Sequence, residues 1–308
     1  MPTIKIALVG LGKIARDQHM PALAANDAFE LVAVASPHQK SSDLPSFKDL
    51  PALIQALPDV SAVALCTPPQ VRYEIARYAL EQGLHVLLEK PPGVTVSEVA
   101  ALTHLAQKKG VALFASWHSR HAGGVEPARE WLRKRKIGNI TVTWKEDVRI
   151  WHPGQTWIWT AGGLGVFDPG INALSILTRI VPRPLVLKAA ELSYPRNSAT
   201  PIAANLSLTD SYGTPVRAEF DFLQTGPQTW NIDVATDSGA LRLSMGGKTL
   251  AIDGLEVPCA SAAEYPDLYS HFADLVYSRR VDVDVAPLQL VADAFLCGRR
   301  MEVEPFVE

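Results

Sequence analysis

Lys90 is the first candidate for chemistry in this chain of 308 residues. It follows an apolar strand and precedes two prolines, in Glu89-Lys90-Pro91-Pro92. An ammonium there can donate to a substrate oxygen and stabilise a developing alkoxide. The alternative is a lysine whose stem packs on the strand end while its charge stays in water, and spacing alone does not decide. Lys90–Pro91 and Pro91–Pro92 are also candidates for a cis peptide.

Asp168 is the second candidate, in the glycine-rich segment 162–172. We expect a mobile turn here that enters a helix reaching about residue 180. Asp168 and Asn172 are four residues apart, so on a helix they face the same way and can accept a proton and fix a hydroxyl. Asp168-Pro169 is also a typical N-cap and first residue of a helix. On local grounds alone, the capping role is preferred.

Aromatic and polar residues gather between these candidates, at Trp144, Glu146, Trp151, His152, Trp157 and Trp159. Aromatic faces with interspersed polar groups suit the C–H faces and hydroxyls of a sugar. A core or interface cluster is the alternative. The spacing of His118, Glu146 and His152 matches no metal motif, so we predict no metal.

A glycine motif follows the first strand, where residues 9–15 read Val-Gly-Leu-Gly-Lys-Ile-Ala. The G-x-G-x-x-A spacing allows a tight turn, close approach of a pyrophosphate and close helix packing. The phosphates would then meet the positive end of the helix. We predict a dinucleotide site formed at this turn and at later strand ends, by Gly10, Gly12, Lys13, Ile14, Ser36, His38, Thr67, Pro68, Glu89 and Lys90.

The second strand ends at Ala35-Ser36-Pro37-His38, without the carboxylate that usually holds the ribose 2′-hydroxyl of NAD. Ser36 can bond a hydroxyl or a phosphate, and His38 and Lys40 can neutralise a 2′-phosphate. Solvation of the loop explains His38 and Lys40 equally well. We predict use of both NAD and NADP without strong preference.

The elements that position these residues fall into two textures. Up to residue 120, strands at 4–9, 31–35, 60–66, 85–88 and 111–114 alternate with helices at 14–25, 50–56, 71–82 and 97–109. This alternation predicts βαβ units and a Rossmann doubly wound parallel sheet, whose ligands lie outside the carboxyl ends of its strands.

The second texture, residues 121–308, predicts an α+β substrate-binding domain on an open, mainly antiparallel sheet. A helix at 125–135 and a strand at 140–149 precede strands at 185–192, 202–209, 216–223, 229–235, 240–244 and 249–252. Helices at 265–277 and 287–301 follow, and the second can pack back on the first domain. The exposed sheet face is compatible with a homodimer.

Composition bounds the partners. The net charge is −3, with 47% hydrophobic and 20% charged residues, which gives no reason to expect nucleic-acid binding. No apolar run approaches the roughly 18 residues of a membrane span, and the opening residues do not resemble a secretory signal. Three widely spaced cysteines suggest no disulfide framework. We expect a cytoplasmic protein.

Together these motifs resemble the Gfo/Idh/MocA oxidoreductases over the whole chain. Segments 12–19, 144–149, 151–155 and 165–175 are similar to the subgroup that oxidises L-arabinose and D-galactose at C1. The family usually has His four residues after the Asp; Asn172 stands here, as in that subgroup. The arabinose-type pattern has Arg after the serine of the second strand, where this chain has Pro37, which weakens the expectation of strong NADP binding.

The resemblance implies an aldose 1-dehydrogenase that oxidises the C1 hydroxyl of L-arabinose, D-galactose or D-fucose to a lactone. It further implies that Lys90 and Asp168 converge beside the nicotinamide, with Asp168 as base and Lys90 as oxyanion partner, or the reverse. Residues for the other hydroxyls would be Asn172, His118, Glu146, His152, Trp151 and Trp230. A dehydrogenase of another polyol, such as an inositol or a sugar nucleotide, is the alternative. A non-catalytic nucleotide sensor is disfavoured by the presence of both Lys90 and Asp168.

Overall fold

The computed structural model describes residues 2–260 and 263–307, which divide into two compact units. The first unit runs to His118 and resumes at Glu264–Val285, and the second comprises Ser119–Ala263 and the segment from Ala286 onward. The chain therefore returns to the first unit late. The expectation that residues 121–308 form one continuous second domain needs this correction. Among the described helices, none is long and apolar enough to cross a membrane.

The described part of the first unit contains a seven-stranded parallel sheet in the order β15-β6-β5-β4-β1-β2-β3. Its strands are β1 (Ile4–Val9), β2 (Phe29–Ala35), β3 (Ser46–Phe47), β4 (Ala62–Leu65), β5 (His85–Glu89), β6 (Leu113–Ser116) and β15 (Val281–Asp282). The order reverses between β1 and β4, and ligands of α/β sheets bind at such a switch point. The predicted Rossmann arrangement is confirmed.

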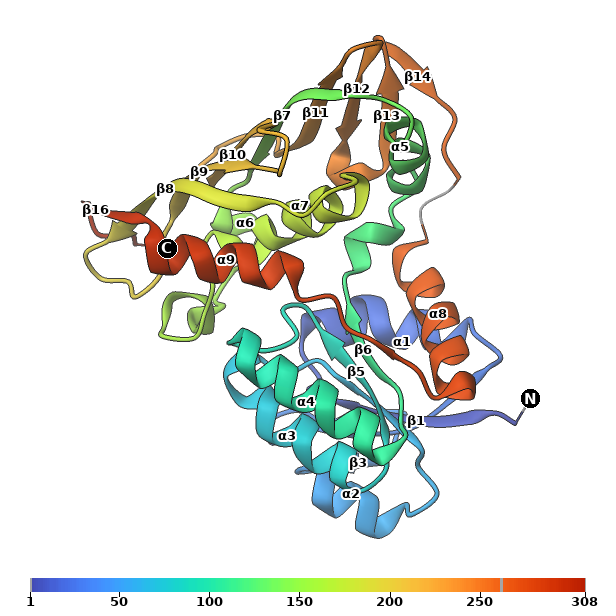
Figure 1. Cartoon of the computed structure of the whole chain (residues 1–308). Helices are drawn as coiled ribbons and strands as arrows, with labels where there is room; N and C mark the ends of the chain where they lie inside the picture. Colours follow the sequence, from blue (N-terminus) through green and yellow to red (C-terminus); the bar gives the residue numbers. More distant parts are fainter. Residues whose placement is uncertain (1, 261–262, 308) are drawn as a thin grey trace. The chain divides into compact units, whose positions relative to one another are not determined.

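Helices cover both faces of this sheet because successive strand residues point to opposite sides. Ile4, Ile6 and Leu8 of β1 pack toward one face, and Ala7 and Val9 toward the other. The first face carries the π-helical turn η1 (Ala15–His19), α1 (Met20–Ala24) and α8 (Glu264–Ser278). The second carries α2 (Leu50–Ala56), α3 (Pro69–Glu81) and α4 (Val96–Lys109). Figure 1 shows these two layers.

Capping residues fix the ends of two of these helices. Asp49 caps α2 through the Ala52 N–H, and Thr95 and Glu98 form a capping box at the start of α4. Gly110 ends α4 in the left-handed conformation that glycine adopts without penalty. Well-capped helices hold the intervening strand ends at one edge of the sheet.

The described part of the second unit has a nine-stranded sheet in the order β14-β13-β12-β11-β7-β10-β9-β8-β16. Its strands are β7 (Ile137–Lys145), β8 (Val186–Pro195), β9 (Ala203–Thr209), β10 (Pro215–Asp221), β11 (Thr229–Thr236), β12 (Gly239–Ser244), β13 (Thr249–Ile252), β14 (Leu255–Val257) and β16 (Arg299–Val303). β7 pairs with β10 and β8 with β16 in parallel, and the other pairings are antiparallel. The sheet is mainly antiparallel, as predicted.

Helix α7 (Phe167–Ile180) forms the core of the second unit, and most of its residues are buried. It contacts α5 (Val125–Leu132) and α9 (Ala286–Cys297), and α9 also contacts β8. In Figure 1, α7 and α9 lie along the same side of the sheet. Shorter elements of the chain are η2 (His118–His121), α6 (Val148–Trp151), η3 (Thr156–Trp159) and η4 (Met245–Gly247).

One prediction at the C-terminal end is wrong. The helix expected at 287–301 ends at Cys297, because Arg299–Val303 pairs with β8 as strand β16. That helix belongs to the second unit, whereas the sequence left open that it packs with the first domain. Helix α8, whose Leu268 and Phe272 are buried, packs on the parallel sheet. The amphipathic pattern of α8 predicts a buried face, but not which sheet covers it.

Candidate active site

The glycine turn after β1 has the conformation that a dinucleotide requires. Gly10 has φ +92°, and a Cβ there would come within 2.9 Å of the Cys66 carbonyl carbon. A Cβ at Gly12 would meet no described protein atom within 4 Å. The protein's own packing therefore requires glycine at position 10, whereas the space at position 12 admits a ligand close to the backbone.

Other residues predicted at this site surround the turn. Thr67 follows β4, and its buried Oγ1 has no hydrogen-bond partner among the described residues. Pro68 is exposed at the start of α3, Ile14 is 37% exposed, and Lys13 pairs with Asp17. An unsatisfied buried hydroxyl beside an open glycine turn fits a polar ligand. These residues fit a dinucleotide.

Residues 36–40, directly after β2, include no carboxylate, and the first acidic residue of this loop is Asp43. The Ser36 N–H donates to the Phe47 carbonyl, and His38 is exposed. Arg16 reaches this loop from η1, and its Nη2 donates to Gln39 Oε1 at 3.2 Å. Sequence reasoning missed Arg16, although its place four residues after Gly12 puts it in the first turn of the helix that follows the fingerprint.

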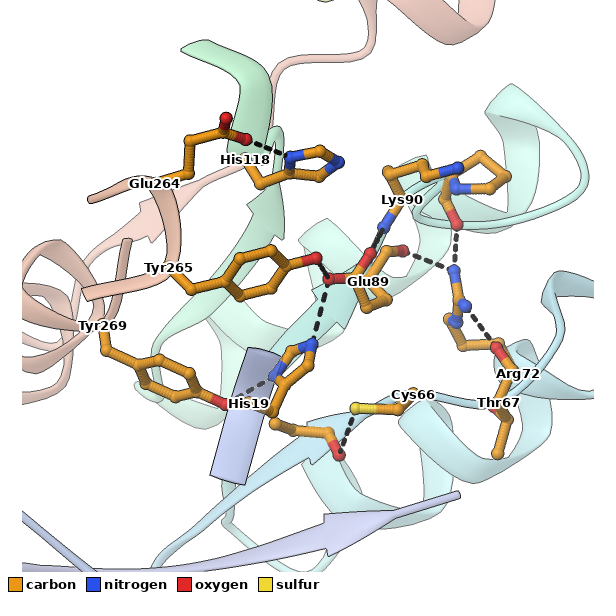
Figure 2. A network of polar contacts seen from close by, with 12 residues as sticks. His19, Cys66, Thr67, Arg72, Glu89, Lys90, His118, Glu264, Tyr265 and Tyr269 are labelled. Atoms are coloured by element: carbon orange, nitrogen blue, oxygen red, sulfur yellow. Dashed lines mark hydrogen bonds and ion pairs between the residues drawn. The ribbon is translucent and has the colours of Figure 1, made fainter. Parts of the chain in front are cut away.

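Lys90 is half-buried at the end of β5, and its bond to Pro91 is cis. Glu89 is 4% exposed, and its contact with the cofactor stays a prediction. Its Oε2 accepts the Lys90 N–H at 2.8 Å, and its Oε1 accepts from His19 Nε2 at 3.0 Å and Tyr265 Oη at 2.8 Å. Figure 2 shows this cluster. The Glu89 carboxylate faces the protein interior.

The pKa values of His19 and Glu89 are shifted in opposite directions. Burial opposes the charge on Glu89, but the hydrogen bond and charge of His19, together with Tyr265, lower the pKa of Glu89 to about 2. Burial likewise opposes a charge on His19, but Cys66, Tyr269 and Glu89 raise the pKa of His19 well above its usual value. Attraction to His19 is the main cause that lowers the pKa of Glu89, whereas Cys66 and Tyr269 contribute more than Glu89 to raising that of His19.

Arg72 of α3 is 2% exposed and donates to backbone carbonyls at both strand ends. Its acceptors are the carbonyl oxygens of Glu89, Pro91 and Thr67. The sequence analysis missed Arg72, because a single arginine within a helix gives no signal of burial. Its guanidinium ties the β4 end to the β5 end.

His118, predicted to bind a sugar hydroxyl, lies after β6 in the first unit. Its Nδ1 contacts Glu264 Oε2 at 2.7 Å, and its ring stacks on Tyr265 with centroids 5.3 Å apart. This contact orients the imidazole and leaves Nε2 as its second polar atom. The hydroxyl-binding role of His118 stays a prediction.

Asp168 is buried in the first turn of α7, at 3% exposure. The helix begins at Phe167 with Val166 as its N-cap, so Asp168 does not occupy the capping position that local sequence favours. Its Oδ2 lies 3.5 Å from His152 Nδ1, which is within ion-pair distance, although this contact does not meet hydrogen-bond geometry. Asn172, one turn later, is partly exposed on the same helix. A buried carboxylate beside an imidazole can accept and pass on a proton.

Glu146 holds His152 in this orientation. Glu146 is 1% exposed, and its Oε1 lies 3.0 Å from His152 Nε2 while its Oε2 accepts from Trp230 Nε1 at 2.8 Å. Trp230, Glu146, His152 and Asp168 therefore form one polar chain, which we call the Asp168 chain. Both Glu146 oxygens already have partners, and direct contact of Glu146 with a sugar hydroxyl stays a prediction.

The tryptophans separate into a buried part and an exposed part. Trp144 is 4% exposed and stacks on Trp230, with centroids 5.7 Å apart. Trp151 is 41% exposed and lies 4.7 Å from Trp230. Trp159 packs on Phe222 and Phe306. Trp144 is therefore a core residue, whereas Trp151 has an exposed aromatic face whose contact with a sugar stays a prediction.

The glycine-rich segment before Asp168 is closely packed rather than mobile. A Cβ at Gly163 would lie 2.3 Å from the Trp157 carbonyl oxygen, and one at Gly165 would lie 2.2 Å from that of Pro201. Close backbone packing explains these glycines. Within the described residues, no group of three or more His, Cys, Asp or Glu side chains is arranged to hold a metal ion.

A doubly wound sheet with a glycine turn at its switch point defines a Rossmann-fold oxidoreductase of the nicotinamide-dependent type. Residues 4–116 match the oxidoreductase family with an NAD-binding Rossmann fold. The chain belongs to this family, Gfo/Idh/MocA, as its sequence motifs suggest.

Two of the similar proteins are galactose 1-dehydrogenases. The chain is 45% identical to galactose 1-dehydrogenase of Pseudomonas fluorescens over 100% of both chains. It is 53% identical to the crystal structure of D-galactose-1-dehydrogenase from Rhizobium etli, with a TM-score of 0.95 over 100% of this chain and 99% of that one. A 3-ketoreductase from Actinomadura kijaniata, solved with NADP, matches at 19% identity with a TM-score of 0.84 over 98% of this chain and 100% of that one. At that identity, the last likeness concerns the fold alone.

Proposed function

We propose that this protein is an aldose 1-dehydrogenase that oxidises D-galactose, and the related L-arabinose and D-fucose, to the lactone with NAD or NADP. Sequence identities of 45% and 53% to two galactose 1-dehydrogenases, over nearly the full length of each chain, support this reaction. The single observation that carries the chemistry is the buried Asp168 carboxylate at the end of a chain that continues through His152 and Glu146.

Each of the candidate residues has a separate role in this proposed reaction. Asp168 takes the proton of the C1 hydroxyl, because a carboxylate beside an imidazole is a general base whose proton has a next acceptor. Lys90 donates to the same oxygen and stabilises its developing negative charge. Gly10, Gly12 and Thr67 hold the dinucleotide, which accepts the C1 hydride when bound. Asn172, His152, Trp151 and Trp230 orient the sugar.

A substrate panel tests this function. We expect activity with D-galactose, L-arabinose and D-fucose, which share the configuration at C2, C3 and C4. D-Glucose, the C4 epimer, should have a kcat/KM at least about tenfold lower, because an unpaired buried polar group costs roughly 1–3 kcal/mol. NADH formation is followed at saturating cofactor. Absence of turnover with every aldose would refute the proposal, whereas activity on inositols or sugar nucleotides alone would reassign the substrate.

Two features support use of both cofactors: residues 36–40 directly after β2 include no carboxylate, and the Arg16 guanidinium donates to Gln39 and Lys40 of this loop. The missing carboxylate removes repulsion of a 2′-phosphate, and Arg16 can attract one. We expect kcat/KM for NAD and NADP to differ by far less than 1,000-fold, which corresponds to roughly 4 kcal/mol. Arg16→Ala should lower kcat/KM for NADP about three- to tenfold while NAD changes little. Equal loss with both cofactors would remove Arg16 from 2′-phosphate recognition.

The remaining sequence predictions concern assembly and location. The sheet face opposite α7 carries exposed polar residues at Asn205, Ser207, Arg217 and Glu219. We propose a homodimer through this face, and light scattering coupled to size exclusion measures its mass. A charge reversal at Arg217 should then shift the mass to that of a monomer. The cytoplasmic location stays a prediction.

A further inference from the structure

The backbone around Lys90 is held from two sides. The Lys90 N–H donates to Glu89 Oε2 at 2.8 Å. The carbonyls on either side of that residue, those of Glu89 and Pro91, both accept from Arg72. A strand end normally leaves such groups to solvent. Here two buried charged side chains take them up (Figure 2).

Glu89 is itself fixed by elements far from it in sequence. His19 is the last residue of η1, the helical turn after the glycine motif, and Tyr265 is in the first turns of α8. Both contact Glu89 Oε1, at 3.0 and 2.8 Å. With Oε2 on the Lys90 N–H, both carboxylate oxygens have partners. The pKa of Glu89 is lowered and that of His19 is raised, the directions expected for an ion pair at this distance.

Burying these charges is expensive, which argues for a role beyond stability. A buried ion pair often contributes no more than an apolar pair of the same shape, because desolvation offsets the attraction. Arg72 is likewise buried, with its guanidinium on three backbone carbonyls. These hydrogen bonds fix the orientation of the Lys90 backbone, because its peptide groups cannot rotate without breaking charge-assisted hydrogen bonds.

We propose that Glu89 and Arg72 are positioning residues that fix the backbone of Lys90, and that His19 and Tyr265 hold Glu89 in place. The helix after the glycine turn and helix α8 are thereby tied to the placement of one ammonium. The proposal rests on the proposed function, in which Lys90 contacts the C1 oxygen.

Two tyrosines on α8 provide a matched test. Both are buried, at 4% for Tyr265 and 0% for Tyr269. Tyr265 Oη bonds Glu89, whereas Tyr269 Oη bonds His19 Nδ1 at 2.7 Å and does not reach the carboxylate that holds Lys90. Each Tyr→Phe change deletes one buried hydrogen bond and should lower Tm by a similar few degrees. We expect Tyr265→Phe to lower kcat about three- to tenfold with KM for the sugar little changed, and Tyr269→Phe to lower it less than twofold. Equal kcat in the two variants would overturn the role of Glu89.

Arg72 is tested against Arg77 on the same helix, which is exposed and pairs with Glu74 and Glu81. Arg72→Lys keeps the charge, but one ammonium cannot reach the carbonyls that a planar guanidinium bridges. We expect kcat to fall about ten- to a hundredfold, since small displacements of catalytic groups have large effects. Arg77→Lys should change nothing. A folded Arg72→Lys protein that turns over within twofold of wild type would refute the role of Arg72.

A measurement without turnover separates this proposal from the proposed function. Reductive methylation with ¹³C-formaldehyde gives each lysine a dimethylamino resonance, and Lys90→Arg identifies that of Lys90. We expect the Lys90 resonance to shift or broaden in Tyr265→Phe and Arg72→Lys, and to stay unchanged in Tyr269→Phe and Arg77→Lys. Unchanged spectra in all four would refute the positioning roles even in an active enzyme. Shifts in an enzyme that oxidises no aldose would refute only the function.

Discussion

The His19–Glu89 pair of the first unit and the His152–Glu146 pair of the second have the same geometry at their centre. In each, Nε2 of the histidine lies 3.0 Å from Oε1 of the glutamate. They differ at Nδ1, which meets the Tyr269 hydroxyl at 2.7 Å in the first pair and the Asp168 carboxylate at 3.5 Å in the second.

Exposure differs in the same sense. The side chain of His19 is 0% exposed, whereas that of His152 is 14% exposed. A pair sealed by tyrosine hydroxyls keeps its protons and serves as an anchor. A pair whose histidine is partly accessible and lies beside a second carboxylate can pass protons on. The same two residue types therefore take different roles according to what their outer nitrogen meets.

The largest effect on turnover is expected from a substitution of Asp168, the residue at one end of the Asp168 chain. Asp168→Asn keeps shape and hydrogen bonding but cannot accept a proton, so we expect kcat to fall about 10²- to 10⁴-fold. The Tm should change little. Asp210 is the matched control, because it is also buried but holds a turn and pairs with Arg183. Asp210→Asn should lose stability and retain turnover. Steady-state rates and thermal melts distinguish the two, and the reverse result would make Asp168 structural.

Lys90→Met should cause the second-largest decrease in kcat. Removal of a donor to a developing oxyanion costs about 10²- to 10³-fold in kcat. The control is the exposed Lys109, the last residue of α4, which donates to the Glu81 carbonyl at the end of α3. Lys109→Met should turn over normally. Initial rates at saturating galactose and cofactor measure the effect, and an active Lys90→Met protein would exclude Lys90 from the chemistry.

The sealed pair should appear in the pH dependence of stability. The pKa of Glu89 is lowered from 4.5 to about 2, so its contribution is complete above pH 4.5 and is lost as pH falls toward 2. The pKa of His19 is raised above 6.5, so its contribution is complete below pH 6.5 and is lost at higher pH. We expect the unfolding free energy of wild type to exceed that of Glu89→Gln most between these values, by a few kcal/mol.

Urea unfolding of both proteins from pH 4 to 9 measures this difference. Glu130→Gln is the control, because Glu130 forms an exposed pair with Arg133 and such pairs contribute little. Its difference from wild type should stay near zero at every pH. A Glu89→Gln difference that is flat from pH 4 to 9 would show that the buried pair is not ionised.

The smallest effect should come from Glu146, which acts on Asp168 only through His152. Glu146→Gln can still accept from Trp230 but holds His152 less firmly, so we expect kcat to fall about tenfold or less. Changes in the pH profile of kcat distinguish this from a loss of packing, since a looser imidazole alters proton transfer. A pH profile identical to that of wild type would limit Glu146 to a structural role.

Much of the site could be predicted because it depends on local spacing. Strand β1 begins and ends as predicted, at Ile4 and Val9. The glycine turn, the strand end at Lys90 and the helix that carries Asp168 and Asn172 each lie within a few consecutive residues. Alternation of apolar residues is enough to place them at strand and helix ends.

The sequence did not predict the partners of those residues. The local sequence favours Asp168 as the N-cap of a helix. In the structure Asp168 lies inside the first turn of α7, buried beside His152. The sequence predicts that Glu89 contacts the cofactor. It does not predict that the Glu89 carboxylate turns inward and accepts a hydrogen bond from Tyr265, 176 residues away. Spacing in sequence carries no information on contacts between such distant residues.

The sequence by itself determined the class of protein, since the fingerprint and the βαβ alternation follow from short-range periodicity. Tertiary structure decided which charges are sealed and which stay accessible. That depends on helix α8 returning to the first sheet and on α7 lying inside the second unit. Burial is a property of the whole fold, and it sets both the pKa of a carboxylate and its access to a proton.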